Sequence, residues 1–181
     1  MIVPVVWHPG YSIPQPAGHP FPMGKFAALG SWLRARGYEH HPAQPAPLAT
    51  LAAVHDLAYL HELAEGSLDA RAQRRIGFAC TPALFERCQL ETGGTLAAVQ
   101  LALAHGLACN AAGGTHHAHR SFGSGYCLIN DLAVAVRHAL DHRTVRRVLI
   151  IDLDVHQGDG TAALLANEPR AFTFSMHCGD N

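Results

Sequence analysis

Apolar and polar positions along the chain follow two spacings, which predict strands separated by helices. Residues 148–151 are apolar at every position, which is typical of a parallel strand covered on both faces. Two other segments carry apolar residues every three or four positions, the spacing of one helix face. They are Leu96, Val99, Leu103 and Leu107 in the first and Leu132, Val136 and Leu140 in the second. Strands that alternate with helices predict a single α/β domain over residues 1–181, with a three-layer, doubly wound parallel sheet.

Turn and cap residues indicate where the other elements begin and end. Gly37 ends one predicted helix, and Asn130 can cap the start of another. The Gly93-Gly94 pair separates two further helices in this interpretation. The expected strands are 2–7, 107–112, 146–156 and 171–177. The expected helices are 25–36, 48–53, 57–65, 82–90, one that begins after residue 94, one that begins after residue 130, and 161–166.

The composition excludes several classes of protein. The net charge of -1 gives no electrostatic basis for binding nucleic acid or an anionic membrane. No apolar run approaches the length of a membrane span, and the N-terminus lacks the pattern of a signal peptide. The five cysteines include no Cys-x-x-Cys pair, which argues against a disulfide framework or a thiolate zinc site. We therefore expect a cytoplasmic protein.

The apolar run at 148–151 leads into Asp152, Asp154 and His156, which alternate with other residues. In an extended strand such residues share one face, and sites in open α/β sheets form beyond the carboxyl ends of strands. A carboxylate and an imidazole suit zinc, so Asp154 and His156 are candidate ligands. Asp152 lies too deep to be a comfortable ligand, and we expect it to orient a histidine ring. The alternative is an ordinary strand with acidic residues at its solvated end.

A second cluster is the glycine and histidine segment at residues 113–119. His116 and His117 cannot easily face one metal together, but each can contact a substrate, and a general base near neutral pH is most naturally a histidine. Asp152 and Asp159 are candidate partners, one for each imidazole. The alternatives are a polar loop with chance histidines and a histidine-rich metal scavenger.

A third cluster places Gly125 before Tyr126, so that an aromatic ring can stand at the wall of a pocket. An aromatic ring packed under a loop explains these two residues equally well. Cys127 has no adjacent base, and we interpret it as a packing residue. The three clusters together predict a metal-activated water that attacks a carbonyl while a histidine takes its proton, which is amide or ester hydrolysis without a covalent intermediate.

These motifs resemble the zinc-dependent histone deacetylase family in order and spacing. The segments concerned are Gly113-Gly114-x-His116-His117-Ala118, Gly125-Tyr126-Cys127-x-x-Asn130-Asp131 and Asp152-x-Asp154-x-His156-Gln157-Gly158-Asp159-Gly160. Residues 19–25 and 54–60 extend the resemblance over the whole chain. Gln157 stands where well-known eukaryotic members have a second histidine, so the chain looks most like the class IV branch and its bacterial relatives.

The resemblance implies an arginase/deacetylase-like fold and a role for each motif residue. Asp154 and His156 would be zinc ligands, and His117 would be the general base paired with Asp159. His116 would be its electrostatic partner, paired with Asp152, and Tyr126 and Gly125 would line the substrate channel. Family members also hold a potassium ion, and the matching positions are Asp152, Asp154, His156, Ser175 and Met176.

The same resemblance implies deacetylation of an acyl-lysine peptide or protein. Relatives also act on long-chain acyl-lysine and on small acylated amines such as polyamines, and a non-catalytic binding module is a further alternative. An arginase-like enzyme with two manganese ions is a rival, but Gly158 stands where its second metal needs a carboxylate. The family's third zinc ligand and its transition-state tyrosine have no match here. We therefore expect the N-terminal portion of a deacetylase, incomplete at the C-terminus and inactive alone.

Overall fold

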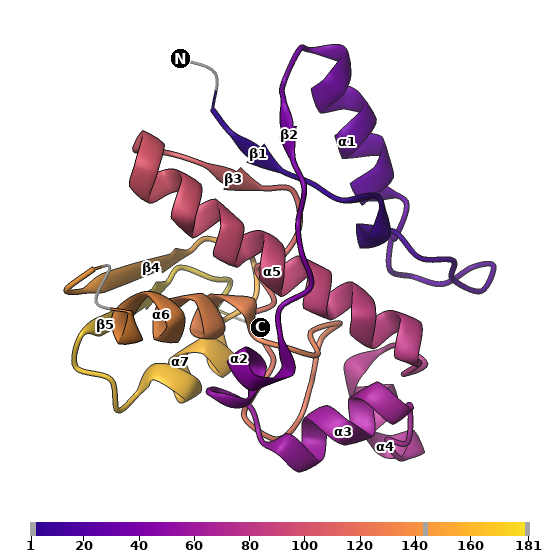
Figure 1. The fold of residues 1–181 in the computed structure, drawn as a ribbon. Helices are drawn as coiled ribbons and strands as arrows, with labels where there is room; N and C mark the ends of the chain where they lie inside the picture. Colours follow the sequence, from indigo (N-terminus) through magenta and orange to yellow (C-terminus); the bar gives the residue numbers. More distant parts are fainter. Residues whose placement is uncertain (1–2, 143–144, 180–181) are drawn as a thin grey trace.

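The computed structural model describes residues 3–142 and 145–179, in which short parallel strands form two separate sheets (Figure 1). In the first sheet β1 (Val5–Val6) lies between β2 (His40–His41) and β3 (Cys109–Asn110). In the second, β4 (Val148–Asp152) pairs in parallel with β5 (Ala171–Ser175). The expected strands at 107–112 and 146–156 are therefore longer than the observed ones. The second correction matters most, because β4 ends at Asp152 and the next residues form a bend.

Helices cover both sheets and connect them. The bounds are η1 (Pro9–Tyr11), α1 (Lys25–Ala35), α2 (Leu48–Ala52), α3 (Leu57–Glu65), α4 (Ala70–Ile76), α5 (Pro82–His105), α6 (Asp131–Asp141) and α7 (Asp159–Leu165). Helix α4 was missed by the sequence patterns. In Figure 1 the long helix α5 crosses the middle of the molecule, with the first sheet and α1 on one side and β4, β5, α6 and α7 on the other.

The division expected at Gly93-Gly94 is wrong, because α5 is a single helix that runs through both glycines. Their role is close packing. A Cβ at Gly93 would lie 1.7 Å from the carbonyl oxygen of Gln44, and one at Gly94 would lie 2.0 Å from the Tyr11 hydroxyl. The two glycines thus let the chain on either side approach the helix backbone.

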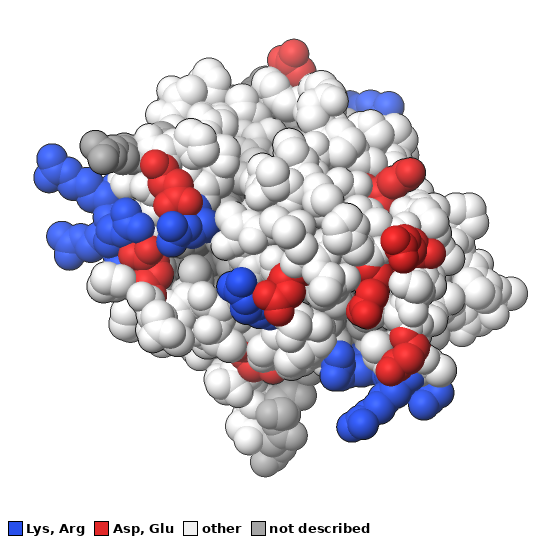
Figure 2. All heavy atoms as spheres, turned by 60° about the horizontal axis from the view of Figure 1, so that its bottom comes forward, with Lys and Arg blue, Asp and Glu red and all other residues white. Residues whose placement is uncertain are grey.

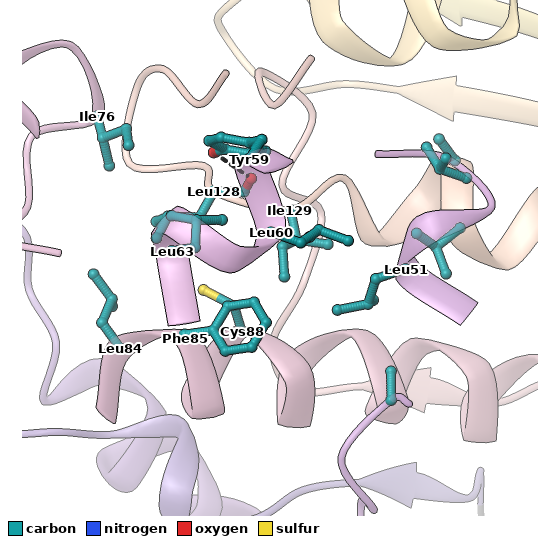
Figure 3. Packing of buried hydrophobic residues seen from close by; sticks show 14 of the residues in the cluster. Leu51, Tyr59, Leu60, Leu63, Ile76, Leu84, Phe85, Cys88, Leu128 and Ile129 are labelled. Atoms are coloured by element: carbon teal, nitrogen blue, oxygen red, sulfur yellow. Dashed lines mark hydrogen bonds between the residues drawn. The ribbon is translucent and has the colours of Figure 1, made fainter. Parts of the chain in front are cut away.

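The main hydrophobic core lies between α3, α5 and the segment before α6 (Figure 3). Leu60 and Leu63 on α3 face Leu84 and Phe85 on α5. The Tyr59 hydroxyl donates a hydrogen bond of 2.9 Å to the carbonyl oxygen of Leu128, so the one polar atom of this ring is satisfied inside the core. This core anchors the chain on both sides of the glycine and histidine segment.

The two-stranded sheet has one packed face and one open face. Val148, Ile150 and Ala171 pack against the core. The alternate positions point away from it, and Leu149 and Phe172 are 57% and 65% exposed. Ile151, Leu153, Val155, Phe174 and Met176 are exposed as well. The expectation that β4 is covered on both faces is therefore wrong for the described residues.

Charged side chains of both signs are interspersed on the face shown in Figure 2. Among the described residues of that face they form no continuous basic stripe, in agreement with the net charge of -1. In the described ranges no helix combines the length and the apolar character that a membrane crossing requires.

Candidate active site

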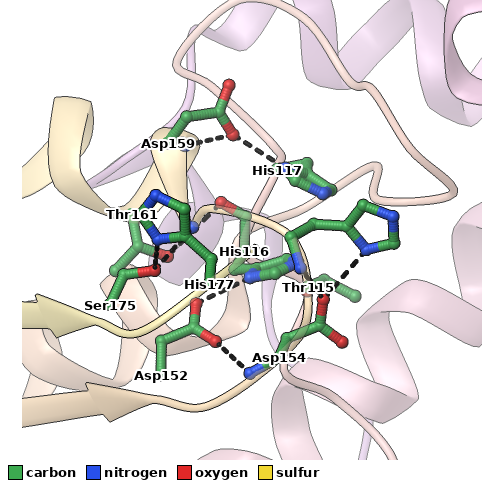
Figure 4. Close-up of polar contacts among 12 residues, drawn as sticks. Thr115, His116, His117, Asp152, Asp154, Asp159, Thr161, Ser175 and His177 are labelled. Carbon is green, nitrogen blue, oxygen red and sulfur yellow. Dashed lines mark hydrogen bonds and ion pairs between the residues drawn. The ribbon is translucent and has the colours of Figure 1, made fainter. Parts of the chain in front are cut away.

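The glycine and histidine segment enters the site between β3 and α6 and presents two imidazoles, each with its own carboxylate (Figure 4). His116 Nδ1 lies 2.6 Å from Asp152 Oδ2, and His117 Nδ1 lies 2.7 Å from Asp159 Oδ1. The two ring centroids are 4.1 Å apart. Because a carboxylate only accepts, each Nδ1 donates, and in the neutral form of such a ring the lone pair is on Nε2.

Asp152 links this segment to the end of β4. It is the last residue of the strand, and its Oδ1 accepts a 3.0 Å hydrogen bond from the backbone N–H of Asp154. Its other oxygen accepts from His116. A Cβ at Gly158 would lie 2.3 Å from Asp152 Oδ2, so only glycine leaves room there for the carboxylate. One nearly buried acid thus sets both the tautomer of an imidazole and the path of the chain after the strand.

Asp154 and His156 are brought together by the bend rather than by a shared strand face. Asp154 Oδ1 accepts from the backbone N–H of His156 at 2.8 Å, and it lies 3.0 Å from His156 Nδ1. The two side chains are 51% and 55% exposed. The hydrogen bond from the His156 backbone is the main reason that the pKa of Asp154 lies below its usual value.

Asp159 begins α7 and is also held as an anion. Partial burial acts to raise its pKa, but the hydrogen bonds from His117 and from the backbone N–H of Gly160 hold it below the usual value. Its position at a helix N-terminus favours a negative charge as well. The carboxylate is therefore a stable partner for the Nδ1–H of His117.

The imidazoles and the Asp154–His156 pair line one cavity of about 380 Å³. Gly125, Tyr126 and Cys127 complete this side of the wall. Sequence reasoning missed the residues of the other side, which are Phe21, Lys25, Phe26, Arg87 and Glu91. The i,i+4 spacing of Arg87 and Glu91 in α5 was the available signal for an ion pair, but not for its burial.

The Arg87–Glu91 pair is buried at the inner end of this wall. Arg87 Nη1 and Nη2 donate to the two oxygens of Glu91 at 2.8 and 2.6 Å, and Arg87 Nε donates to the carbonyl oxygen of Tyr11 at 2.7 Å. Burial raises the pKa of Glu91 above its usual value, and the Arg87 charge opposes that rise. The buried Arg87–Glu91 pair therefore forms part of the cavity wall, together with the aromatic rings of Phe21, Phe26 and Tyr126.

Tyr126 adopts a left-handed backbone conformation, with φ of 66°, and its ring packs against aromatic neighbours. The Phe21 and Phe78 ring centroids lie 5.1 and 5.3 Å from that of Tyr126. A Cβ at Gly77 would lie 2.7 Å from the tyrosine ring, so the end of α4 makes room for it. Neighbouring Cys127 is buried, and burial raises the pKa of its thiol to about 12, in agreement with a packing role.

Ser175 is the last residue of β5, where it pairs with Asp152, and Met176 follows it. The Met176 backbone N–H donates to the carbonyl oxygen of Asp152 at 3.0 Å. Ser175 Oγ lies 2.9 Å from His177 Nδ1 and accepts from the Gly158 N–H at 3.3 Å. Neither Ser175 nor Met176 lines the cavity of about 380 Å³.

The donor atoms near the cavity fit a zinc ion in kind but not in number. Asp154 and His156 offer one carboxylate oxygen and one imidazole nitrogen close enough to reach one cation. A catalytic zinc normally has three protein ligands. Within residues 3–142 and 145–179, no group of three or more His, Cys, Asp or Glu side chains is arranged to hold a metal.

Comparison with known proteins gives the family. The model of the histone deacetylase domain matches residues 19–181. The chain belongs to the histone deacetylase family. It is 30% identical over 169 residues to histone deacetylase 2 of Arabidopsis thaliana, and 47% identical over 182 residues to an uncharacterized protein of Picosynechococcus sp.. The family resemblance drawn from the motifs is therefore confirmed.

Solved structures of the family confirm the fold class. A histone deacetylase homologue from Aquifex aeolicus superposes with a TM-score of 0.81 at 26% identity, and a homologue complexed with SAHA superposes with a TM-score of 0.82 at 27%. Each superposition covers 98% of this chain and 51% of the other. The chain likewise spans 61% of the Picosynechococcus protein and 44% of the Arabidopsis deacetylase.

Proposed function

We propose that this chain carries the proton-transfer half of a zinc-dependent deacylase, which hydrolyses an acyl-lysine amide. Family membership supports the class of reaction. The observation that carries the proposal is the pair of imidazoles, each hydrogen-bonded to a separate carboxylate, on the wall that also holds Asp154 and His156. The chain corresponds to about half of its solved relatives, so we assign the activity to the intact polypeptide that carries these residues.

In this proposal Asp154 and His156 hold the zinc ion, and the third protein ligand comes from outside the 181 residues. When bound, zinc supplies an acidified water and polarises a carbonyl oxygen. We also assign a potassium ion to the oxygen atoms around Asp152, Ser175 and Met176.

The residues of this chain then move and hold protons. His117 accepts the proton of the attacking water at Nε2, because its Nδ1 already donates to Asp159. We assign His116 as the electrostatic partner of His117, because the two ring centroids lie 4.1 Å apart and the His116 Nδ1 is held by Asp152. The Tyr126 and Phe21 rings form an apolar wall for the methylene chain of the substrate.

Metal binding by the intact polypeptide tests the ligand assignment, because the proposal takes the third ligand from outside the 181 residues. We expect titration calorimetry to give one zinc ion per polypeptide, and we expect Asp154→Ala combined with His156→Ala to abolish this binding. The matched control is Asp141→Ala combined with His105→Ala, which removes the same two side-chain types from the ends of α6 and α5. Unchanged zinc affinity in the Asp154/His156 variant would refute the assignment.

Turnover by the intact polypeptide tests the reaction. We expect hydrolysis of an acetyl-lysine peptide that chelation abolishes and zinc restores. Parallel assays with a myristoyl-lysine peptide and acetylspermidine separate the alternative substrates. Release of none of the three acyl groups, from protein that binds zinc, favours a non-catalytic binding module. The class IV likeness and a cytoplasmic location stay predictions.

A further inference from the structure

Asp131, the first residue of α6, is 1% exposed although it carries a carboxyl group. Its Oδ2 accepts from the Thr95 hydroxyl at 2.6 Å and from the Gly114 N–H at 3.1 Å. Its Oδ1 accepts from the Thr115 N–H at 2.8 Å, and the Thr115 hydroxyl lies 2.6 Å away. Two of these contacts are with backbone N–H groups of the loop and two are with threonine hydroxyls, so both oxygens of the carboxyl group have hydrogen-bond partners.

Gly114 and Thr115 directly precede the two imidazoles, so these hydrogen bonds fix where the His116–His117 loop begins. Gly113 has φ of +88° and Gly114 has φ of +73°, conformations that other residues rarely adopt. A Cβ at Gly113 would lie 2.3 Å from Asp131 Oδ2. The backbone therefore passes directly against the carboxylate.

The neighbouring residue holds the other end of the same loop. Asn130 Nδ2 donates to the carbonyl oxygen of Ala118 at 3.2 Å and to the Thr161 hydroxyl at 3.0 Å. Adjacent side chains at the start of α6 thus hold the chain before and after His116 and His117.

Capping of α6 does not explain the buried carboxylate of Asp131. The cap is Asn130, whose Oδ1 accepts from the Ala133 N–H at 2.9 Å. An acidic residue in the first turn of a helix gains from the helix dipole while exposed to solvent. Burial adds a desolvation cost that only the hydrogen bonds to the loop and to Thr95 offset.

We propose that Asp131 is a positioning residue, which holds the loop so that each imidazole keeps its hydrogen bond to its own carboxylate. The catalytic consequence rests on the proposed function, whereas the effect on the two rings does not. Replacement by Asn presents an amide N–H₂ where one oxygen accepted two donors, so we expect the loop to shift and the ring hydrogen bonds to loosen.

The test is long-range ¹H–¹⁵N NMR of the histidine rings in the whole chain. Spectra are recorded at a temperature well below the midpoint of thermal unfolding of each variant. We expect Nδ1-protonated shifts for His116 and His117 in the parent. In Asp131→Asn the Nδ1 and Nε2 shifts of at least one ring should move toward each other. The matched control is Asp69→Asn, which removes a carboxyl that caps α4 without touching the loop. Parent-like ring shifts in Asp131→Asn would overturn the proposal, even if its midpoint falls.

Thr95 provides a second variant if Asp131→Asn does not fold. Thr95→Val deletes the hydroxyl that Asp131 Oδ2 accepts from, and Thr95→Ser keeps it. We expect a smaller displacement of the ring shifts in the valine variant and parent-like shifts in the serine variant. Identical spectra for the two variants would contradict the proposal.

An activity measurement on the intact polypeptide separates this inference from the proposed function. We expect Asp131→Asn to lower kcat by about 10²-fold, because misplacing a catalytic group by about 1 Å has effects of that order, and to leave KM within about threefold. If the parent shows no turnover, the proposed function fails and the NMR result still decides the role of Asp131. A normal kcat with displaced ring shifts overturns the catalytic consequence alone.

Discussion

The two halves of the candidate site differ in how their geometry is held. The His116–His117 loop is partly buried, with His116 and Ala118 in the buried part, and hydrogen bonds from the start of α6 and from α7 hold it on both flanks. The segment with Asp154 and His156 is half exposed. Hydrogen bonds within a few residues shape it, and a backbone bond of 2.9 Å from the Cys178 N–H to the Val155 carbonyl oxygen ties it to the chain after β5. The difference teaches that the described residues hold the two imidazoles, which the proposal assigns to proton transfer, more firmly than the two proposed metal ligands.

The sheet beneath the second half explains this difference. Asp154 and His156 stand at the end of a two-stranded sheet whose outer face is apolar and open. Parallel sheets are normally covered on both faces, and an exposed apolar patch marks a surface that contacts something else. Anything that covers this face therefore adds order to the metal-ligand segment, while the His116–His117 loop is already held.

The largest effect should come from the residue that joins the two halves. Asp152→Ala leaves the Nδ1–H of His116 and the N–H of Asp154 without their acceptor. We expect zinc affinity to fall by about 10- to 100-fold, as for other residues that orient ligands, and stability to fall by about 1–3 kcal/mol. Calorimetry and urea unfolding measure the two effects. Loss of stability with unchanged zinc affinity would break the link between the halves.

A polar residue should lower the stability of the protein much more on the packed face of β4 than on its open face. Ile150→Thr, on the packed face, should cost about 1–3 kcal/mol, whereas Ile151→Thr, on the open face, should stay within about 0.5 kcal/mol. Sedimentation velocity should also show less self-association for Ile151→Thr, because it interrupts the apolar patch. Equal losses of stability for the two variants would mean that the open face is covered in solution.

The sequence predicted the site side chains of both halves better than it predicted the residues that hold those side chains in place. The two imidazole–carboxylate hydrogen bonds have the partners that the family resemblance implied, because each motif lies at an element end that the fold brings to one edge. The roles of these side chains stay predictions. The local sequence did not distinguish Asp131 from an ordinary acid at the start of a helix, since only tertiary packing buries it.

The errors in the predicted fold have the same origin. Gly93-Gly94 suggested a break in α5, but the reason for the glycines is the chain packed against them. The apolar run at 148–151 predicted two covered faces, yet burial depends on neighbours that the run itself does not specify. Alternation within 152–156 suggested a shared strand face. Instead, the backbone N–H groups of Asp154 and His156 donate to the side chains of Asp152 and Asp154, and the chain bends after Asp152.

A methyl group at Gly125 should disturb the firmly held half directly. Gly125 has φ of +52°, and a Cβ there would lie 2.6 Å from His117 Cδ2. Gly18 is the matched control, because it has φ of +79° and open space where its Cβ would lie. We expect about 1–2 kcal/mol of backbone strain for each alanine variant in thermal unfolding. Only Gly125→Ala should also displace the His117 ring resonances, and an undisturbed ring would show that the loop yields easily.

Acid should loosen the firmly held half first, through His55. This residue is 1% exposed. Its Nδ1 lies 2.9 Å from the carbonyl oxygen of His119, and its Nε2 accepts a hydrogen bond of 3.0 Å from the Asn130 N–H. It therefore joins the end of the loop to the residue that caps α6. Burial is the main reason that its pKa lies below the usual 6.5. Protonation of the ring would place a hydrogen on Nε2, so that Nε2 could no longer accept the hydrogen bond from the Asn130 N–H.

The sign of the pH effect follows from proton binding. Below pH 6.5 the unfolded chain protonates this histidine while the folded chain resists, so the contribution of His55 is full above pH 6.5 and is lost as the pH falls. One proton gives a slope of at most about 1.4 kcal/mol per pH unit. We expect His55→Gln to remove that slope from urea unfolding between pH 6.5 and 5, and His61→Gln, on the outer side of α3, to retain it.

Hydrogen exchange should show the same ordering, with the amide of Asn130 losing protection at low pH before that of His156. The reverse order would mean that local hydrogen bonds hold the metal-ligand segment more firmly than burial holds the loop.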